Sequence, residues 1–283
     1  MNASLHSLLS PERLTEVVDV GAKLGDGDPH YTPLLAAGLC RVTGFEPQEE
    51  EFALLQAEEG PDRRYLPYAV GDGKPHTLNI CRSRGMTSLL EPDPATLEVF
   101  GILAPLAEVI KRVPLETRRL DDIPEIQHLD FLKIDAQGSE LAVFQGGSAK
   151  LAEAVVIQTE VAFVPLYKGE AGLGDIDLEL RSQGFLPHGF VEMKPWRLGS
   201  SSTPRVPSPG ANQLLEADIV YVRDFVHADA MSDEQLKHLA LISHHCFGSV
   251  DLALRCVIIL EQRQVLGAGT QQRYLDILNA IYR

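Results

Sequence analysis

Short apolar segments alternate with segments of helical spacing over about the first 220 residues, and this alternation limits the possible folds more than any other feature. Eight segments are predicted to be strands: Val17–Val20, Arg41–Phe45, Tyr65–Val70, His76–Cys81, Phe131–Ile134, Ala154–Thr159, Phe185–Val191 and Asp218–Val222. Several are apolar almost throughout, which is typical of strands buried on both faces of a mainly parallel sheet. The pattern therefore predicts an α/β fold.

Helical segments separate the strands and then replace them. Between the strands, helices are expected at Tyr31–Leu39, Glu49–Glu58, Ser139–Phe144 and Asp175–Ser182. The stretch Lys194–Pro209 is rich in Gly, Ser and Pro, which predicts a long mobile loop. After Arg223 only amphipathic helices are predicted, at Ser232–His244, Val250–Gln262 and Thr270–Ile281. We therefore expect two domains, residues 1–223 and a C-terminal helical extension, residues 224–283.

Charge and composition exclude several kinds of partner. The 283 residues carry a formal net charge of −15, with −8 in residues 1–60 and −9 in residues 121–180. Such a charge repels phosphate backbones and anionic lipids, so neither nucleic acid nor a membrane is expected as a partner. The sequence shows no secretory signal and no membrane-spanning run, and its four cysteines lie far apart. A cytoplasmic protein with reduced thiols is predicted.

Glycines and carboxylates gather where the first two predicted strands end. Gly21 follows the first strand, and Glu46 follows the second. In a doubly wound sheet the carboxyl ends of these strands flank a ligand crevice, where Glu46 could accept hydrogen bonds from both hydroxyls of a ribose. The glycine spacing after the first strand is G-x-x-x-G-x-G rather than the G-x-G-x-x-G of dinucleotide folds. This difference counts against a nicotinamide-dependent oxidoreductase.

Further acids follow later strands. Asp72, between two glycines, could bind the amino group of a purine, or it could belong to an ordinary turn. Asp135 and Glu160 end the strands at Phe131–Ile134 and Ala154–Thr159, and they are the two best-placed groups for accepting a proton. Paired acids could instead bind a divalent metal, but no dedicated metal-binding loop is present. Tyr167, just beyond a strand end, is more simply a surface loop residue than a contact to a ligand.

Taken in order, the motifs of residues 14–223 resemble the FkbM family of S-adenosylmethionine-dependent methyltransferases. The resemblance rests on Val-Asp-Val-Gly-Ala at 18–22, Gly-Phe-Glu-Pro at 44–47, Ala-Val-Gly-Asp at 69–72, Gly-Met-Thr-Ser-Leu at 85–89, Leu-Lys-Ile-Asp-Ala-Gln-Gly-Ser-Glu at 132–140, Thr-Glu-Val-Ala-Phe-Val-Pro-Leu-Tyr at 159–167 and Glu-Ala-Asp-Ile-Val-Tyr-Val at 216–222. It implies a Rossmann-like class I methyltransferase sheet of seven mostly parallel strands with a reversed last strand.

The resemblance also implies a role for each matching residue. The family positions that bind the donor, S-adenosylmethionine, correspond to Asp19, Gly21 and Ala22 at its methionine and ribose, Glu46 at the ribose hydroxyls, Gly71 and Asp72 at the adenine, Thr87 and Ser88 close by, and Asp135 and Gln137 next to the methyl group. Lys23 departs from the family, which commonly has Asn there, and Asp26–Pro29 looks like an insertion. These departures imply a reshaped donor pocket, a loop that contacts the substrate, or a loss of donor binding.

The expected activity is O-methylation of a hydroxyl on a sugar, glycan precursor or natural product. Removing the hydroxyl proton needs a base, for which Asp135 is favoured and Glu160 is the rival. A second hypothesis is a non-catalytic module that binds a partner through the helical extension, with Lys23 and the insertion as its support. The helical extension is also a candidate surface for a homodimer.

Overall fold

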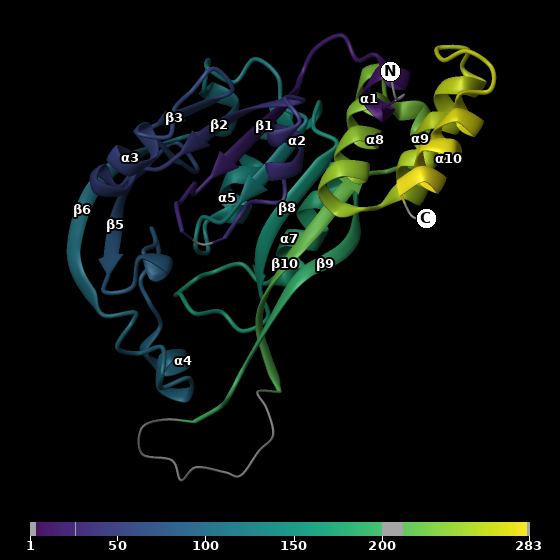
Figure 1. Ribbon diagram of the computed structural model, residues 1–283. Coiled ribbons are helices and arrows are strands. Elements are labelled where there is room, and N and C mark those ends of the chain that lie inside the picture. Colours follow the sequence, from purple (N-terminus) through teal and green to yellow (C-terminus); the bar gives the residue numbers. More distant parts are fainter. Residues whose placement is uncertain (1–3, 26, 200–211, 282–283) are drawn as a thin grey trace.

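The computed structural model describes residues 4–25, 27–199 and 212–281. Its centre is a seven-stranded sheet in the order β3-β2-β1-β7-β8-β10-β9 (Figure 1). The strands are β1 (Thr15–Val20), β2 (Cys40–Phe45), β3 (Arg63–Leu66), β7 (Phe131–Ile134), β8 (Val156–Ala162), β9 (Phe185–Trp196) and β10 (Gln213–Arg223). Neighbouring strands from β3 to β8 are parallel, whereas β10 is antiparallel to both β8 and β9. The predicted α/β fold, with its reversed last strand, is confirmed.

A second, three-stranded sheet lies beside the first. Its order is β4-β6-β5, built from β4 (Ala69–Val70), β5 (Pro75–Cys81) and β6 (Val109–Arg118). The single strand predicted at Tyr65–Val70 was wrong, because β3 and β4 belong to different sheets. Pro67 lies between them and has no N–H to donate, so a continuous ladder would be interrupted there. Strand β6 was not predicted, because it is mostly exposed and half of its ten residues are polar or charged.

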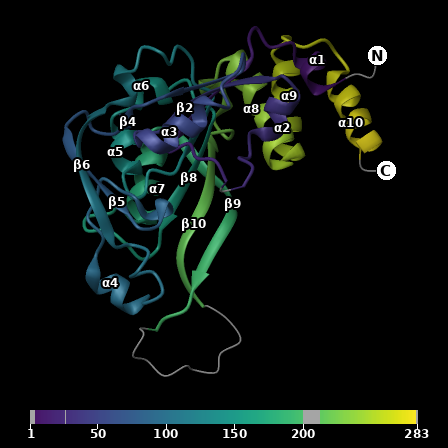
Figure 2. The same cartoon turned by 60° about the vertical axis from the view of Figure 1, so that its left-hand side comes forward.

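Helices cover both faces of the main sheet (Figure 2). One face carries α5 (Glu140–Gln145), α6 (Ser148–Leu151) and α7 (Leu173–Ser182), and the other carries α1 (Leu5–Leu9), α2 (Thr32–Ala36), α8 (Asp233–Phe247), α9 (Val250–Gln262) and α10 (Thr270–Ile281). Side chains of a strand alternate between faces, so Val17 joins the core under α8 and Val18 joins the core under α5. Two further helices, α3 (Glu49–Gln56) and α4 (Pro94–Val99), flank the sheets.

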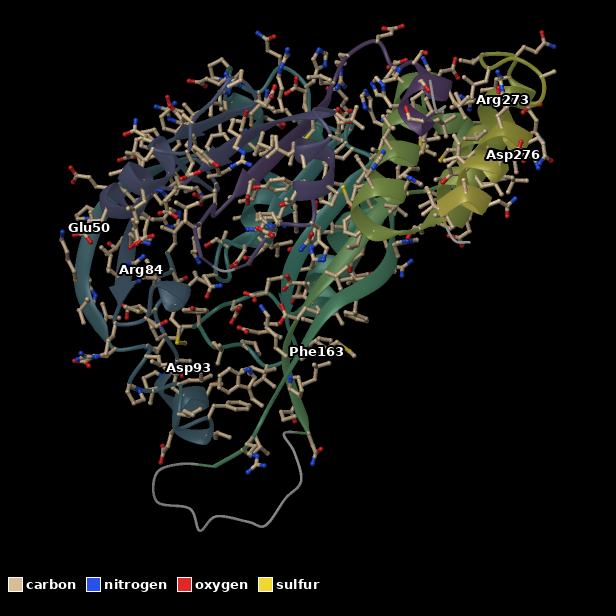
Figure 3. The ribbon with its side chains drawn as sticks, viewed as in Figure 1. Glu50, Arg84, Asp93, Phe163, Arg273 and Asp276 are labelled. Carbon is tan, nitrogen blue, oxygen red and sulfur yellow. The ribbon has the colours of Figure 1, made fainter. Side chains whose placement is uncertain are left out.

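The three predicted C-terminal helices are present, and they share a core with the sheet. Leu239 of α8 belongs to the same buried cluster as Val156 of β8 and Val222 of β10. On the outermost helix, α10, Tyr274 is buried while Arg273 and Asp276 are on the outer side, as Figure 3 shows. The division of the chain at residue 223 stays a prediction, and the helices after it complete the layer on one face of the sheet.

The stretch predicted to be a loop at Lys194–Pro209 begins as a strand. Residues 194–196 continue β9 and pair with β10, where Lys194 is opposite Glu216 and Trp196 is opposite Gln213. Residues 200–209 of the predicted loop lie outside the described residues. The four cysteines are free thiols, as predicted. Over the described ranges, none of the helices has the length and apolar character that crossing a membrane requires.

Candidate active site

One face of the main sheet changes from apolar to charged as its strands approach the carboxyl edge. On β7 the sequence runs from buried Phe131 to Lys133 two residues later, and on β8 it runs from Val156 through Gln158 to Glu160. The spacing of two keeps these side chains on the same face as the core under α8. Neighbouring strands bring the polar positions together, because Lys133 is in register with both Asp19 and Gln158.

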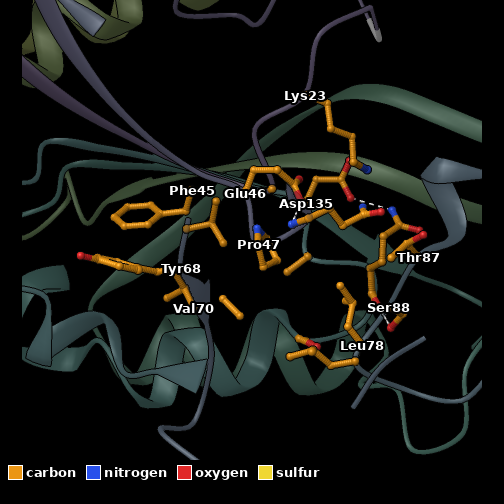
Figure 4. Close-up of a pocket in the computed structure, with 18 residues that line it drawn as sticks. Lys23, Phe45, Glu46, Pro47, Tyr68, Val70, Leu78, Thr87, Ser88 and Asp135 are labelled. Atoms are coloured by element: carbon orange, nitrogen blue, oxygen red, sulfur yellow. Dashed lines mark hydrogen bonds between the residues drawn. The ribbon is translucent and has the colours of Figure 1, made fainter. Parts of the chain in front are cut away.

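Two cavities open at this edge. The first, here called the β2-side cavity, lies beyond the ends of β1, β2 and β7. Its polar lining includes six of the predicted site residues: Gly21, Glu46, Thr87, Ser88, Asp135 and Gln137. Figure 4 shows Phe45 and Tyr68 at one end and Asp135 and Thr87 at the other. The cavity therefore has an aromatic end and a polar end.

Glu46 lies in the β2-side cavity at the carboxyl end of β2 and is 2% exposed. Its Oε1 accepts a hydrogen bond of 2.7 Å from the backbone N–H of Gln48. Burial raises the pKa of Glu46 to about 7, and the charges of Glu51 and Asp135 act in the same direction. Lys23 and the bond from Gln48 oppose this shift. A carboxylate here becomes a strong hydrogen-bond acceptor when a ligand replaces the lost water.

Only glycine fits at position 21, because of its backbone conformation and its close neighbours. Its φ of 77° lies in the left-handed region, and a Cβ added there would be 2.0 Å from the backbone oxygen of Asp135. The turn after β1 therefore packs directly against the residue that follows β7. This contact keeps the floor of the β2-side cavity open, because any side chain would force the two backbones apart.

Four of the ten residues predicted to bind the donor lie elsewhere. Asp19 and Ala22, as well as Gly71 and Asp72, are not part of the lining of the β2-side cavity. Ala22 packs with Leu55 in a small buried cluster, and a Cβ on Gly71 would be 3.1 Å from the Thr117 side chain.

Asp72 makes the ordinary turn that its sequence also allowed. It accepts from the backbone N–H of Lys74 at 3.0 Å and contacts Nε2 of His76 at 2.8 Å. Burial acts to raise the pKa of Asp72, but the contacts with His76 and Lys74 outweigh it and lower the pKa to about 2. A carboxylate held in this way has several of its acceptor positions already used.

The second cavity, here called the β10-side cavity, lies over the charged face of the sheet. Seven carboxylates and three lysines line it: Asp19, Asp28, Asp135, Glu160, Glu192, Glu216, Asp218, Lys23, Lys133 and Lys194. Met86, Leu103, Leu166 and Trp196 add an apolar wall. Asp28 and Pro29 of the predicted insertion reach this lining, while Asp26 lies outside the described residues.

Gln137 connects the two predicted acids. Its Nε2 donates to Asp135 Oδ1 at 2.6 Å and to Glu160 Oε2 at 3.1 Å. Its Oε1 accepts from the hydroxyl of Tyr167 at 3.0 Å, and its backbone oxygen accepts from Ser88 Oγ at 2.6 Å. The φ of Gln137 is 50°, a strained conformation for this residue type, which these bonds hold in place. Asp135 and Glu160 are thus brought together as expected.

The pKa values of the two acids shift in opposite directions. Although burial opposes it, the positive charges of Lys23 and Lys133 lower the pKa of Asp135, and the bond from Gln137 adds to this effect. Burial and the charge of Asp135 raise the pKa of Glu160 well above its ordinary value. When two acids share a site, ionisation of one disfavours ionisation of the other. The pKa of Asp135 therefore lies below that of Glu160.

Sequence reasoning missed two members of this network. Lys194 Nζ lies 2.6 Å from Glu160 Oε1 and 3.4 Å from Asp218 Oδ1. The interpretation of Tyr167 as a surface loop residue was wrong, because its side chain is 2% exposed and donates to Gln137. The repeated spacing of polar residues two apart, near the ends of β8 and β10, was the signal that could have indicated a charged sheet face.

The residues described contain no cluster of three or more His, Cys, Asp or Glu side chains arranged to hold a metal ion. The acids at the strand ends instead contact lysines and amide groups. Lys133 Nζ, for example, is 3.0 Å from Asp19 Oδ1, while Asp19 Oδ2 accepts a 2.7 Å hydrogen bond from Tyr31.

The strand order and the cavities at the carboxyl edge are those of a Rossmann-like α/β fold. Within that fold class the chain belongs to the FkbM family, because the model of the methyltransferase FkbM domain matches residues 19–187. The protein is therefore a methyltransferase of the S-adenosylmethionine-dependent kind, and the family match decides against the oxidoreductase hypothesis.

Several solved structures are similar to this chain at low identity. One is magnesium protoporphyrin IX methyltransferase from Synechocystis PCC 6803 with bound SAM, at 13% identity over 75% of this chain and 71% of that chain, with a TM-score of 0.39. Another is a TehB-like SAM-dependent methyltransferase from Corynebacterium glutamicum, at 12% identity over 76% of this chain and 83% of that chain, with a TM-score of 0.34. Among curated proteins none matches this sequence.

Proposed function

We propose that the protein transfers the methyl group of S-adenosylmethionine to a hydroxyl of a sugar, glycan precursor or natural product. The observation that carries the proposal is the junction of the two cavities. Gly21, Lys23, Asp135 and Gln137 line both of them, so a donor in one cavity and an acceptor in the other would meet there. Bringing two reactants together in line supplies much of the rate in such a transfer.

The β2-side cavity fits the donor by its chemistry. Its aromatic and apolar end, with Phe45, Tyr68 and Val70, suits adenine, and the buried Glu46 suits the two ribose hydroxyls. Gly21 leaves room for the chain of the donor to pass close to the backbone. When bound, S-adenosylmethionine supplies an electrophilic methyl carbon on a sulfonium. Asp135, whose pKa is lowered by Lys23 and Lys133 against the effect of burial, would lie at the junction, where its carboxylate would attract that positive charge.

The acceptor would bind in the β10-side cavity. Its carboxylates and lysines can hydrogen-bond to several hydroxyls, while Leu103, Leu166 and Trp196 can cover an apolar ring face. In the proposed transfer, Asp135 would accept the proton of the acceptor hydroxyl, whose oxygen would take the methyl group while the donor would leave as a neutral thioether. Gln137 and Lys194 hold Asp135 and Glu160 in place during this step.

Two measurements test the proposal. S-adenosylhomocysteine, the product of the donor, should release or absorb heat on titration and raise the melting temperature of the protein. A donor labelled in its methyl group should then pass the label to a member of a panel of hydroxylated sugars and natural products. An Asp135→Asn variant should keep the binding and lose the transfer. Absence of any binding of S-adenosylhomocysteine would refute the proposal, and binding without transfer to any acceptor would favour the non-catalytic module.

A further inference from the structure

Lys23 has an unusual position among the cations of the site. It lines both cavities, at the junction where the proposed donor and acceptor would meet. The other two lysines of the β10-side cavity have carboxylate partners, Lys133 with Asp19 at 3.0 Å and Lys194 with Glu160 at 2.6 Å. For Lys23, no carboxylate oxygen of a residue that the structure describes lies within 4.0 Å of the ammonium.

The charge of Lys23 nevertheless affects the pKa values of acids on both sides of the junction. It is among the causes that lower the pKa of Asp135, and it opposes the upward shift at Glu46. Figure 4 shows Lys23 beside Asp135 and Glu46, along the wall of the β2-side cavity. The side chain is half-buried. A half-buried cation without an ionic partner is suited to receive a negative group from a ligand.

The chemistry of the donor identifies that group. S-adenosylmethionine carries a sulfonium, an ammonium and a carboxylate, and of these only the carboxylate is negative at neutral pH. With the ribose at Glu46 and the sulfonium at Asp135, the amino-acid part of the donor would extend from the junction past the turn that follows β1. Lys23 belongs to that turn, two residues beyond Gly21.

We infer that Lys23 binds the α-carboxylate of the donor, so that it acts as a positioning residue for the methyl group. The inference rests on the proposed function. It also explains why Lys23, where the family commonly has Asn, is compatible with donor binding: the ammonium replaces the amide as the contact to the donor. An amide at this position offers a neutral hydrogen bond, whereas an ammonium offers a charged one, which is roughly twice as strong. The carboxylate would in turn provide an ionic partner, which Lys23 does not have among the residues that the structure describes.

The test compares two ligands that differ in the carboxylate. S-adenosylhomocysteine has it, and 5′-methylthioadenosine has the same nucleoside and thioether without the amino-acid group. Binding of both is measured by calorimetry to the wild type, Lys23→Met, Lys23→Arg and the control Lys111→Met, which removes an exposed lysine of β6 outside both cavities. Thermal melts confirm that each variant is folded.

We expect a loss of affinity only for S-adenosylhomocysteine and only in the Lys23→Met variant. Lys23→Met should weaken S-adenosylhomocysteine by about tenfold or more and leave 5′-methylthioadenosine within about twofold. Lys23→Arg should keep most of the affinity, and Lys111→Met should change neither ligand.

Several other results would overturn the inference. Equal weakening of both ligands would mean that Lys23 only shapes the cavity. Unchanged binding of both would show that its charge serves something other than the donor. Tighter binding of S-adenosylmethionine to Lys23→Met, with S-adenosylhomocysteine unaffected, would place the ammonium against the sulfonium. If the wild type bound neither nucleoside, the proposed function itself would fail, and the two failures are therefore distinguishable.

Discussion

Gln137 donates its side-chain amide to Asp135 at 2.6 Å and to Glu160 of β8 at 3.1 Å, and the second bond links the turn after β7 to β8. The oxygen of the same amide group receives the hydroxyl of Tyr167. One neutral side chain thus separates two carboxylates that would otherwise repel each other at close range. The arrangement places the acid with the lowered pKa, Asp135, at the junction of the two cavities.

Replacing Gln137 by Glu should disrupt this arrangement. The change keeps the size of the side chain but substitutes a third acid for the amide that donates to Asp135 and Glu160. We expect the variant to lose about 1–3 kcal/mol of unfolding free energy at pH 8, because the two hydrogen bonds are replaced by repulsion. Urea unfolding at pH 8 and at pH 5 measures the effect, and the loss should shrink at pH 5, where the added acid takes up a proton. An equal loss at both pH values would contradict this account.

Gly21→Ala should damage both stability and donor binding. A methyl group there would meet the Asp135 oxygen at 2.0 Å, and the positive φ adds strain. The matched control is Gly25→Ala, which has a φ of 97° but no atom within 4 Å of the added Cβ. Strain alone should cost about 1–2 kcal/mol in the control, and the contact should cost about 1–3 kcal/mol more in Gly21→Ala. Thermal melts and titration with S-adenosylhomocysteine compare them, and equal losses would show that the close approach is unimportant.

The ion pair of Asp19 and Lys133 should behave as a unit. Both side chains are largely buried, and Asp19 also accepts from Tyr31. Although burial opposes it, the charge of Asp19 raises the pKa of Lys133. Removing one partner leaves a buried charge alone, so Lys133→Met should cost about 3–5 kcal/mol in urea unfolding.

The double variant provides the control for this pair. Asp19→Asn combined with Lys133→Met should cost less than the sum of the two single changes, because neither leaves an unpaired charge in the presence of the other. Additive losses would mean that the two side chains contribute independently and that the 3.0 Å contact carries little energy.

Glu46 should make stability depend on pH. Burial raises its pKa from 4.5 to about 7 in the folded chain. Between these two values the unfolded chain releases the proton while the folded chain keeps it, so this group lowers stability as pH rises from about 4.5 to about 7. Glu46→Gln should remove this contribution. Its melting temperature should therefore exceed that of the wild type by more at pH 8 than at pH 5, and a constant difference would contradict the shifted pKa.

The same group should control binding of the donor. Hydroxyls of a ribose bond more strongly to an ionised carboxylate than to a neutral one. Affinity for S-adenosylhomocysteine should therefore rise by up to about tenfold between pH 6 and pH 8 in the wild type, as Glu46 ionises. Calorimetry at both pH values should show that rise in the wild type and a flat response in Glu46→Gln. A rise in both would assign the pH dependence to another group.

The sequence predicts the position of a residue when a short apolar strand comes directly before it. Glu46 and Asp135 directly follow short apolar strands, so their place at the carboxyl edge follows from the direction of the parallel sheet. Lys194 could not be found in this way. It stands before a proline and a long Gly-, Ser- and Pro-rich stretch, and it belongs to a strand only because β10, about 20 residues later, pairs with it. Asp72 was predicted to contact the donor from the family motif. In the structure its own turn provides its partners, Lys74 and His76.

The packing of α8 against the first strand determines when the chain can complete its core during synthesis. Thr15 Oγ1 lies 3.0 Å from His238 Nδ1, a contact between residues that are 223 positions apart. Val17 and Phe131, on β1 and β7, leave the ribosome long before the helix that covers them. Their face of the sheet stays open to other apolar surfaces until α8 has been made. The nascent chain is therefore most exposed to aggregation after its catalytic strands exist and before its last helices do.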